Sequence, residues 1–94
     1  MQWATYILLC ADGFFYVGHT EDVQKRLATH NEGEGADYTA RRRPVELAYC
    51  ENHASKAEAI AREVQIKKWS RAKKQALIEG NVGKLHKLAK RRSA

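Results

Sequence analysis

An apolar run close to the N-terminus restricts the folds open to this chain more than any other segment. Residues 3–10 (WATYILLC) carry aromatic and branched side chains, a composition typical of a strand that is buried on both faces. The sequence Ala11-Asp12-Gly13 then supplies a turn, and residues 14–18 (FFYVG) predict an antiparallel partner strand. This segment therefore predicts a β-hairpin, as part of a small antiparallel sheet with helices packed on it.

The segment after the hairpin predicts a short helix and then a loop. Thr20 is a good N-cap, and the two acidic residues that follow complement the N-terminal end of the helix dipole. Val23 and Leu27 lie one turn apart as an apolar stripe, so we expect a helix over residues 21–30. Residues 31–43 lack apolar periodicity and predict an ordered but mobile loop.

The next part of the chain predicts one more strand and a capped helix. Residues 45–51 (VELAYCE) follow Pro44 and have the composition of a third strand. Ser55 and Glu58 match the capping box, so we expect a helix that runs to about Trp69. Its apolar residues at helical spacing are Ala57, Ile60, Ala61 and Val64.

The C-terminal part predicts another helix and a basic tail. Ser70 caps a helix over residues 71–79, and Gly80 ends it. Residues 81–94 predict a weak helix that frays and that belongs to, or packs on, the same domain. We therefore expect one α+β domain over residues 1–80, with a small three-stranded antiparallel sheet flanked by three to four helices.

The cysteines and the apolar N-terminal run point to a reducing compartment. Cys10 and Cys50 each lie in an apolar strand-like run, so we expect two buried, reduced thiols and neither a zinc site nor a disulfide. The run at residues 3–10 is too short to span a bilayer and has no basic region before it. We therefore expect no signal peptide, no membrane anchor and a cytoplasmic location.

Charge is distributed unevenly along the chain. The protein has 17 Lys and Arg residues against 11 Asp and Glu residues, a net charge of +6. Residues 1–40 hold two basic and six acidic residues, whereas residues 41–94 hold fifteen basic and five acidic ones. Such polarity is typical of a protein that binds a polyanion on one side, and nucleic acid is the commonest large polyanion. The alternative is a basic solvated surface with no specific partner.

Five chemically versatile side chains are expected to lie close together. Tyr6 and Tyr16 lie on the paired strands, so their rings become cross-strand or diagonal neighbours. Arg26 and His30 are four residues apart and share one helix face, where we expect both to be partly exposed. Glu63 lies at the edge of the core face of its helix, where a firmly held carboxylate can still reach a cleft.

This set of residues suits the hydrolysis of a phosphodiester. A lone carboxylate can hold Mg²⁺, which keeps several waters, and an arginine can neutralise charge on the phosphate. A tyrosine or histidine can position or deprotonate water. Each residue also has a structural interpretation: Tyr6 and Tyr16 as packing, Arg26 as a solvated charge, His30 as a partner of the helix dipole, and Glu63 in an ion pair with Lys67.

The pattern resembles the GIY-YIG nuclease superfamily, and most closely its small stand-alone bacterial branch, the UPF0213-type proteins. The resemblance runs from Thr5 to about Ile78, most of the chain. It rests on these motifs: ATY around Tyr6, YVG at Tyr16 to Gly18, KRLATHN with Arg26 and His30, GADYT-ARRRPVEL around Tyr38, and REVQIKKWSRAKK with Glu63.

The resemblance implies roles for these residues. Tyr6 and Tyr16 would lie near the attacking water, with Tyr6 as the base, and Arg26 would stabilise the phosphorane-like transition state. Glu63 would bind the metal, one Mg²⁺ or Mn²⁺ ion. His30 and Tyr38 would assist by orienting water or contacting the scissile phosphate. Gly18 belongs to the second motif.

The chain also departs from the family pattern. Ala4-Thr5 replaces the Gly-Ile pair of the first motif, as in many members of this branch. His19 follows the YVG triplet and receives no role from the resemblance. A further set of basic residues would grip phosphates on either side of the cut, or would otherwise be solvated charge: Arg41, Arg42, Arg43, Lys67, Lys68, Arg71, Lys73 and Lys74.

The predicted function is that of a metal-dependent endonuclease that hydrolyses DNA phosphodiester bonds. Damaged or branched DNA in repair or recombination is the candidate substrate, with RNA as a second candidate, and so small a body predicts little sequence specificity. We expect a monomer or a weak dimer that does not bind membranes. Two alternatives are a nucleic-acid-binding module without turnover and a basic adaptor that binds a protein through residues 82–94.

Overall fold

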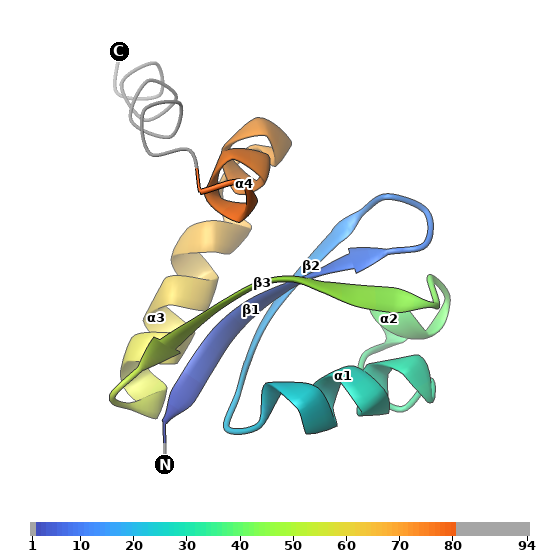
Figure 1. Ribbon diagram of the computed structural model, residues 1–94, viewed down its shortest axis with the longest axis horizontal. Coiled ribbons are helices and arrows are strands. Elements are labelled where there is room, and N and C mark those ends of the chain that lie inside the picture. The colour runs from blue at the N-terminus through green and yellow to red at the C-terminus, as the bar shows by residue number, and fades with distance from the viewer. Residues whose placement is uncertain (1, 81–94) are drawn as a thin grey trace.

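Strand β1 (Trp3–Cys10) lies in the middle of a three-stranded antiparallel sheet, between β2 (Phe15–Thr20) and β3 (Val45–His53). This computed structural model describes residues 2–80 (Figure 1). Within that range the helices are α1 (Val23–Asn31), α2 (Asp37–Ala40), α3 (Lys56–Lys67) and α4 (Arg71–Ile78). The predicted α+β fold class is confirmed. The predicted tail helix lies outside the described residues.

Alternate residues of β1 face opposite helical layers. Tyr6 and Leu8 belong to one buried cluster, onto which Leu27 of α1 packs. Ile7 belongs to a second buried cluster with Ile66 of α3, onto which residues of α4 also pack. In Figure 1, α1 and α2 accordingly lie apart from α3 and α4. The predicted burial of β1 on both faces is therefore correct, and each face has its own core.

None of the helices in residues 2–80 is long and apolar enough to cross a membrane.

The β1–β2 turn forms where the sequence predicts it. Gly13 has a φ of +88°, which a residue with a Cβ rarely adopts, and its N–H donates to the Cys10 carbonyl at 2.9 Å. The Asp12 side chain accepts from the Phe14 N–H at 3.2 Å. The turn fixes the register of the hairpin, in which Tyr6 pairs with Gly18 and Leu8 with Tyr16.

Two predictions about the segment after the hairpin are wrong. Helix α1 begins at Val23 and its N-cap is Asp22, whose carboxylate accepts from the Lys25 N–H at 3.0 Å. Thr20 is the last residue of β2 and accepts from the Asp22 N–H instead. The expected loop over residues 31–43 contains the short helix α2, which has too few residues to show apolar periodicity.

The expected buried face of α3 is also wrong. Ile60 and Val64 are 37% and 46% exposed, whereas Ala59 and Ile66 are fully buried. The Ala59 carbonyl accepts from the Thr5 hydroxyl at 2.9 Å, so this small residue brings the helix close to β1. Glu63 lies four residues after Ala59, on the same face of α3, and therefore also points toward the sheet.

Cys50 is exposed, contrary to the prediction that both thiols are buried, whereas Cys10 is buried as expected. Cys50 lies on β3, an edge strand, and pairs with Tyr6 of the central strand. A residue on an edge strand keeps one side open even when its sequence neighbours are apolar.

Candidate active site

A pocket of about 220 Å³ lies beside the edge strand β2. It brings together the residues on which the sequence prediction rests, drawn from β1, β2, α1 and α3. Its lining consists of Tyr6, Tyr16, Gly18, His19, Arg26, His30, Gly35 and Glu63. The expected convergence of the two tyrosines, the Arg26/His30 pair and the single carboxylate is therefore present in the fold.

The deepest contact of the pocket joins Tyr6 to His30. The phenol oxygen lies 3.0 Å from His30 Nε2, and both residues are almost fully buried, at 2% and 1% exposed. His30 Nδ1 lies 2.7 Å from the Thr39 hydroxyl, whose own proton goes to the Ala36 carbonyl at 3.0 Å. The network therefore assigns the proton of the neutral ring to Nδ1, and Nε2 accepts from the Tyr6 hydroxyl.

Burial keeps both members of this pair neutral. Desolvation raises the pKa of Tyr6 well above its usual value, and the nearby Tyr16 and Glu63 raise it further while Arg26 lowers it. Desolvation, with the Arg26 charge, lowers the pKa of His30. The prediction that His30 is partly exposed is wrong, because this face of α1 packs on the core and buries the side chain. Arg26, one turn earlier on α1, is exposed.

Tyr16 and Tyr38 extend the aromatic wall outward. Tyr16 and Tyr6 are diagonal neighbours with ring centroids 6.4 Å apart, one of the two arrangements expected for them. The Tyr16 ring also lies 5.0 Å from the His30 ring and 5.9 Å from the Tyr38 ring. Tyr38, at the start of α2, is 37% exposed, and the Arg42 guanidinium lies 4.0 Å above its ring. Tyr38 is thus not among the residues that line the pocket and reaches the site only through its contact with Tyr16.

Two glycines allow the buried pair to lie so close to the backbone. A Cβ on Gly18 would lie 2.5 Å from the Tyr6 phenol oxygen and 2.6 Å from its Cζ. A Cβ on Gly35 would overlap the His30 ring at Nδ1. Any larger residue at either position would push Tyr6 or His30 out of place.

Glu63 forms the opposite wall of the pocket. Its Oε1 lies 2.8 Å from His19 Nδ1, and its Oε2 lies 3.0 Å from Lys67 Nζ. The side chain is only 14% exposed, so the contact with Lys67 belongs to a held carboxylate rather than to a loose surface pair. By contrast, no hydrogen bond or ion pair among residues 2–80 engages the Arg26 guanidinium, which leaves it available to an anion.

The donor set of the pocket suits a hard divalent cation with few protein ligands. Residues 2–80 contain no group of three or more His, Cys, Asp or Glu side chains placed to hold a metal. Glu63 alone supplies carboxylate oxygens, and Mg²⁺ accepts such a site because it retains waters and binds substrate phosphate. The residues present therefore fit Mg²⁺ or Mn²⁺, and would not form a closed metal cage.

The basic residues predicted to grip phosphates make different contacts within the chain. Arg43 donates to the Ala40 and Asn31 carbonyls and holds the loop, whereas Arg42 pairs with Asp12 at 2.9 Å. Arg71 donates to the Gly13 carbonyl, so Arg42 and Arg71 both contact the β1–β2 turn. The remaining members have other surroundings: exposed Arg41, Lys67 at Glu63, exposed Lys68, Lys73 over the Trp69 ring, and half-buried Lys74 near Arg71.

Two residues that line the pocket, His19 and Gly35, and one residue behind it, Thr39, were missed by sequence reasoning. His19 received no role, yet it contacts Glu63 from 44 residues away. Thr39 fixes the His30 tautomer, and Gly35 makes room for the same ring. The sequence offered two weak signals, the position of Thr39 near a helix start and the G-x-G spacing that includes Gly35. Neither signal indicates that these residues contact His30.

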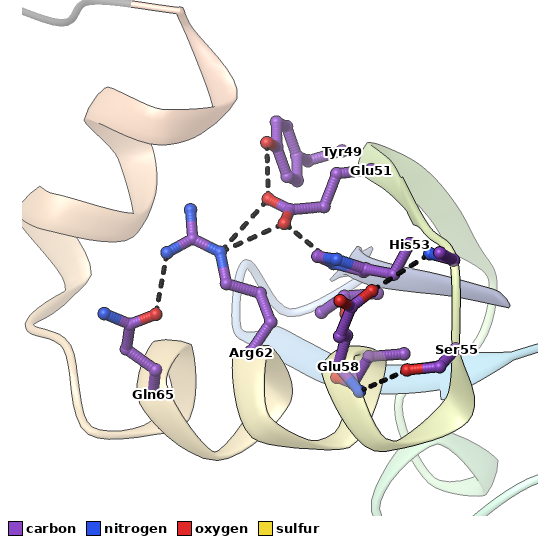
Figure 2. A network of polar contacts seen from close by, with 10 residues as sticks. Tyr49, Glu51, His53, Ser55, Glu58, Arg62 and Gln65 are labelled. Carbon is purple, nitrogen blue, oxygen red and sulfur yellow. Dashed lines mark hydrogen bonds and ion pairs between the residues drawn. The ribbon is translucent and has the colours of Figure 1, made fainter.

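A second polar cluster lies between β3 and α3 (Figure 2). Tyr49 donates to Glu51 Oε1 at 2.7 Å, and Arg62 Nε lies 3.2 and 3.1 Å from the two oxygens. His53 Nε2 lies 2.9 Å from Oε2. Burial and the bond to Glu51 raise the pKa of Tyr49 to about 12. The Glu51 carboxylate is thus surrounded by partners from its own chain.

Comparison with known proteins identifies the fold. Residues 2–76 match the GIY-YIG catalytic domain. The chain belongs to the GIY-YIG family. GIY-YIG proteins are generally endonucleases and typically use divalent metals. The resemblance seen in the motifs is therefore confirmed.

Two similar proteins place this GIY-YIG protein in the predicted branch. It is 57% identical over 74 residues to a UPF0213 protein of Bacillus pumilus, covering 79% of this chain and 76% of that protein. It is 53% identical over 73 residues to the UPF0213 protein VNG_2274C of Halobacterium salinarum, covering 78% and 95%. The latter is an archaeal relative, so the branch is not restricted to bacteria.

Two solved GIY-YIG relatives share the fold. The solution NMR structure of the UPF0213 protein BH0048 from Bacillus halodurans is 41% identical, covers 88% of each chain and has a TM-score of 0.56. That of EF2693 from E. faecalis is 39% identical, covers 85% of each chain and has a TM-score of 0.59.

Proposed function

We propose that this GIY-YIG protein is a divalent-metal-dependent endonuclease that hydrolyses phosphodiester bonds in DNA. The observation that carries the proposal is the hydrogen bond from Tyr6 to the neutral His30, inside a pocket shared with Arg26 and Glu63. Family membership supports the same reaction class. Damaged or branched DNA is the proposed substrate, because such DNA exposes its backbone to a small protein.

The proton path avoids a buried phenolate. Because the pKa of Tyr6 is raised, the phenol stays protonated before the reaction. When water attacks phosphorus, the Tyr6 oxygen takes a proton from that water while the phenol proton passes to His30 Nε2. The lowered pKa of His30 keeps this nitrogen unprotonated and ready to accept at neutral pH. A new phosphorus–oxygen bond forms, the scissile one breaks, and the leaving oxygen takes a proton from solvent.

The two charged residues act on the phosphate. The Arg26 guanidinium, without another partner among residues 2–80, would bind the non-bridging oxygens and stabilise the charge that develops there. Glu63 would hold Mg²⁺ or Mn²⁺, and the bound ion supplies Lewis-acid stabilisation of the scissile phosphate. His19 would orient the Glu63 carboxylate through its Nδ1 contact.

A binding module without turnover is the second candidate. One observation favours it: both Glu63 oxygens already have cationic or hydrogen-bonding partners, His19 and Lys67. In that case the basic residues would bind nucleic acid, binding would weaken steeply with salt, and Glu63→Ala would change it little.

The deciding experiment measures cleavage of labelled single-stranded, duplex, nicked, flap and fork DNA, with an RNA version, in Mg²⁺, Mn²⁺ or chelator. Tyr6→Phe, Arg26→Ala and Glu63→Ala are compared with the parent protein. We expect metal-dependent cutting that all three substitutions abolish while salt-sensitive binding persists. Binding without cutting on every substrate would overturn the nuclease proposal in favour of the binding module.

A further inference from the structure

A second and larger cavity, of about 660 Å³, opens next to the catalytic pocket. It lies around the end of β2, between α1 and the first turn of α3, which flank that strand end in Figure 1. His19 and Arg26 line both cavities, so the two spaces adjoin. A substrate phosphate held by Arg26 would therefore have its neighbouring nucleotide at this second cavity.

The cavity has an aromatic wall. Trp3 is half-buried at the start of β1, and its ring lies 6.1 Å from the His19 ring. Lys56 Nζ, at the start of α3, lies 5.3 Å from the centre of the Trp3 ring. Aromatic side chains beside a cation are the usual platform for a nucleobase, because every base has a π-face that stacks on such rings.

The charge of the cavity suits a base rather than a second phosphate. Lys25 and Lys56 contribute positive charge, and Glu21 and Asp22 contribute negative charge on the same wall. Asp22 is committed to the N-cap of α1 and cannot be displaced without fraying that helix. Apart from Arg26, the lining is therefore nearly neutral, and a polyanionic group would gain little there. An uncharged heterocycle with donors and acceptors matches both the rings and the polar rim.

We propose that this cavity is a subsite for an unpaired nucleobase adjacent to the scissile phosphate, with Trp3 as its stacking platform. The volume lies within the range of small-ligand sites and accommodates one nucleotide. The proposal rests on the proposed function in that Arg26 must bind the scissile phosphate. It adds a substrate requirement: the nucleotide beside the cut is out of the helical stack when it is bound.

Heteronuclear NMR offers a direct test, because the protein has two tryptophans, Trp3 and Trp69, and the indole N–H of each can be followed. The probes are a 5′-phosphorylated thymidine dinucleotide, its versions lacking the first base, the second base or both, and inorganic phosphate. All titrations contain chelator, so the result does not depend on cleavage. Trp69, which lies between Arg62 and Lys73, serves as the internal control.

We expect the intact dinucleotide to shift the Trp3 indole signal and leave that of Trp69 in place. Removal of one base, but not of the other, should weaken binding about tenfold and remove the Trp3 shift. Trp3→Ala should bind the intact and the single-base probes alike, whereas Trp3→Phe should retain the preference. Equal Trp3 shifts with the fully abasic dinucleotide or with inorganic phosphate would overturn the proposal. A protein that shows the expected shifts but cuts nothing would instead overturn the proposed function alone.

Discussion

The pocket beside β2 and the cluster between β3 and α3 use the same four residue types. Each has a tyrosine whose pKa is raised chiefly by desolvation, a histidine, an arginine and a glutamate. In the cluster, Glu51 receives Tyr49, His53 and Arg62 at once, so every charge is matched within the chain. In the pocket, the tyrosine proton goes to a histidine, and the arginine and the carboxylate both line the same open space.

Residue type alone therefore does not make a site. A carboxylate surrounded by a tyrosine, a histidine and an arginine is a structural crosslink, because binding anything else would first require breaking those contacts. Arg26 lacks such partners among residues 2–80, and its charge remains available to a phosphate. An arginine without a matched acid, beside a cavity, is the stronger indication of function.

Removing the tyrosine hydroxyl from each region in turn should give the largest contrast in activity. Tyr6→Phe should lower the single-turnover cleavage rate about a thousandfold, because general acid–base groups contribute on the order of 10²–10⁴-fold. Tyr49→Phe should leave that rate within about twofold, as expected for a residue outside the reaction. Comparable losses in the two variants would show that the two clusters do not have separate roles.

Adding a side chain at Gly18 should give the next largest loss of cleavage activity. Gly18→Ala should reduce cleavage about a hundredfold, because the added Cβ displaces the Tyr6 phenol and small misplacements are costly in catalysis. Gly80→Ala is the control: its φ of +71° predicts a loss of stability, but nothing lies within 4 Å of its added Cβ. The idea fails if Gly18→Ala retains full activity with a parental NMR spectrum.

The two glutamates should separate stability from activity. Glu51→Gln should lower the free energy of unfolding by about 1 kcal/mol, because it weakens a partly buried set of charged hydrogen bonds, and should leave cleavage unchanged. Glu63→Gln should instead abolish metal-dependent cleavage. Urea unfolding and cleavage assays on both variants measure the two effects, and a cleavage defect in Glu51→Gln would contradict the assignment of its cluster as structural.

The smallest effect concerns pH. The pKa of His30 is lowered from its usual 6.5 in the folded state, so below pH 6.5 the unfolded chain binds more protons than the folded one. The stability that His30 contributes is complete above that pH and decreases as the pH falls toward the folded-state pKa. Urea unfolding from pH 7 downward should show a shallower decrease in His30→Gln than in the parent. Parallel curves would mean that His30 does not titrate differently on folding.

Elements with strong local signals were predictable from the sequence. The hairpin follows from an apolar run and a turn glycine, and α3 and α4 follow from serine caps whose hydroxyls accept the expected backbone N–H bonds. Helix α2 was not predictable because four residues carry no period. Nor was the inward face of α3, because Ile60 and Val64 form an apolar stripe that the tertiary structure leaves exposed.

Only part of the candidate site was expected from the sequence, and its contacts were not. The motifs marked Tyr6, Arg26 and Glu63, yet nothing local to His19 indicates that its partner lies on α3. Nothing in the sequence around Thr39 indicates that its hydroxyl contacts His30 in the fold. Contacts between residues distant in the sequence depend on the packing of whole elements, and a local pattern does not contain that information.

The alternation along β1 also limits how this family can evolve. Thr5 and Ile7 face α3, whereas Tyr6 and Leu8 face α1. Side chains that pack on α3 therefore alternate along the strand with side chains on the face that carries the catalytic tyrosine. Inserting or deleting a single residue in β1 would exchange the two sets and send the phenol to the wrong layer. Substitutions can therefore accumulate in this strand while its length stays fixed, and changes of length should be confined to connections that carry no side chain into the pocket.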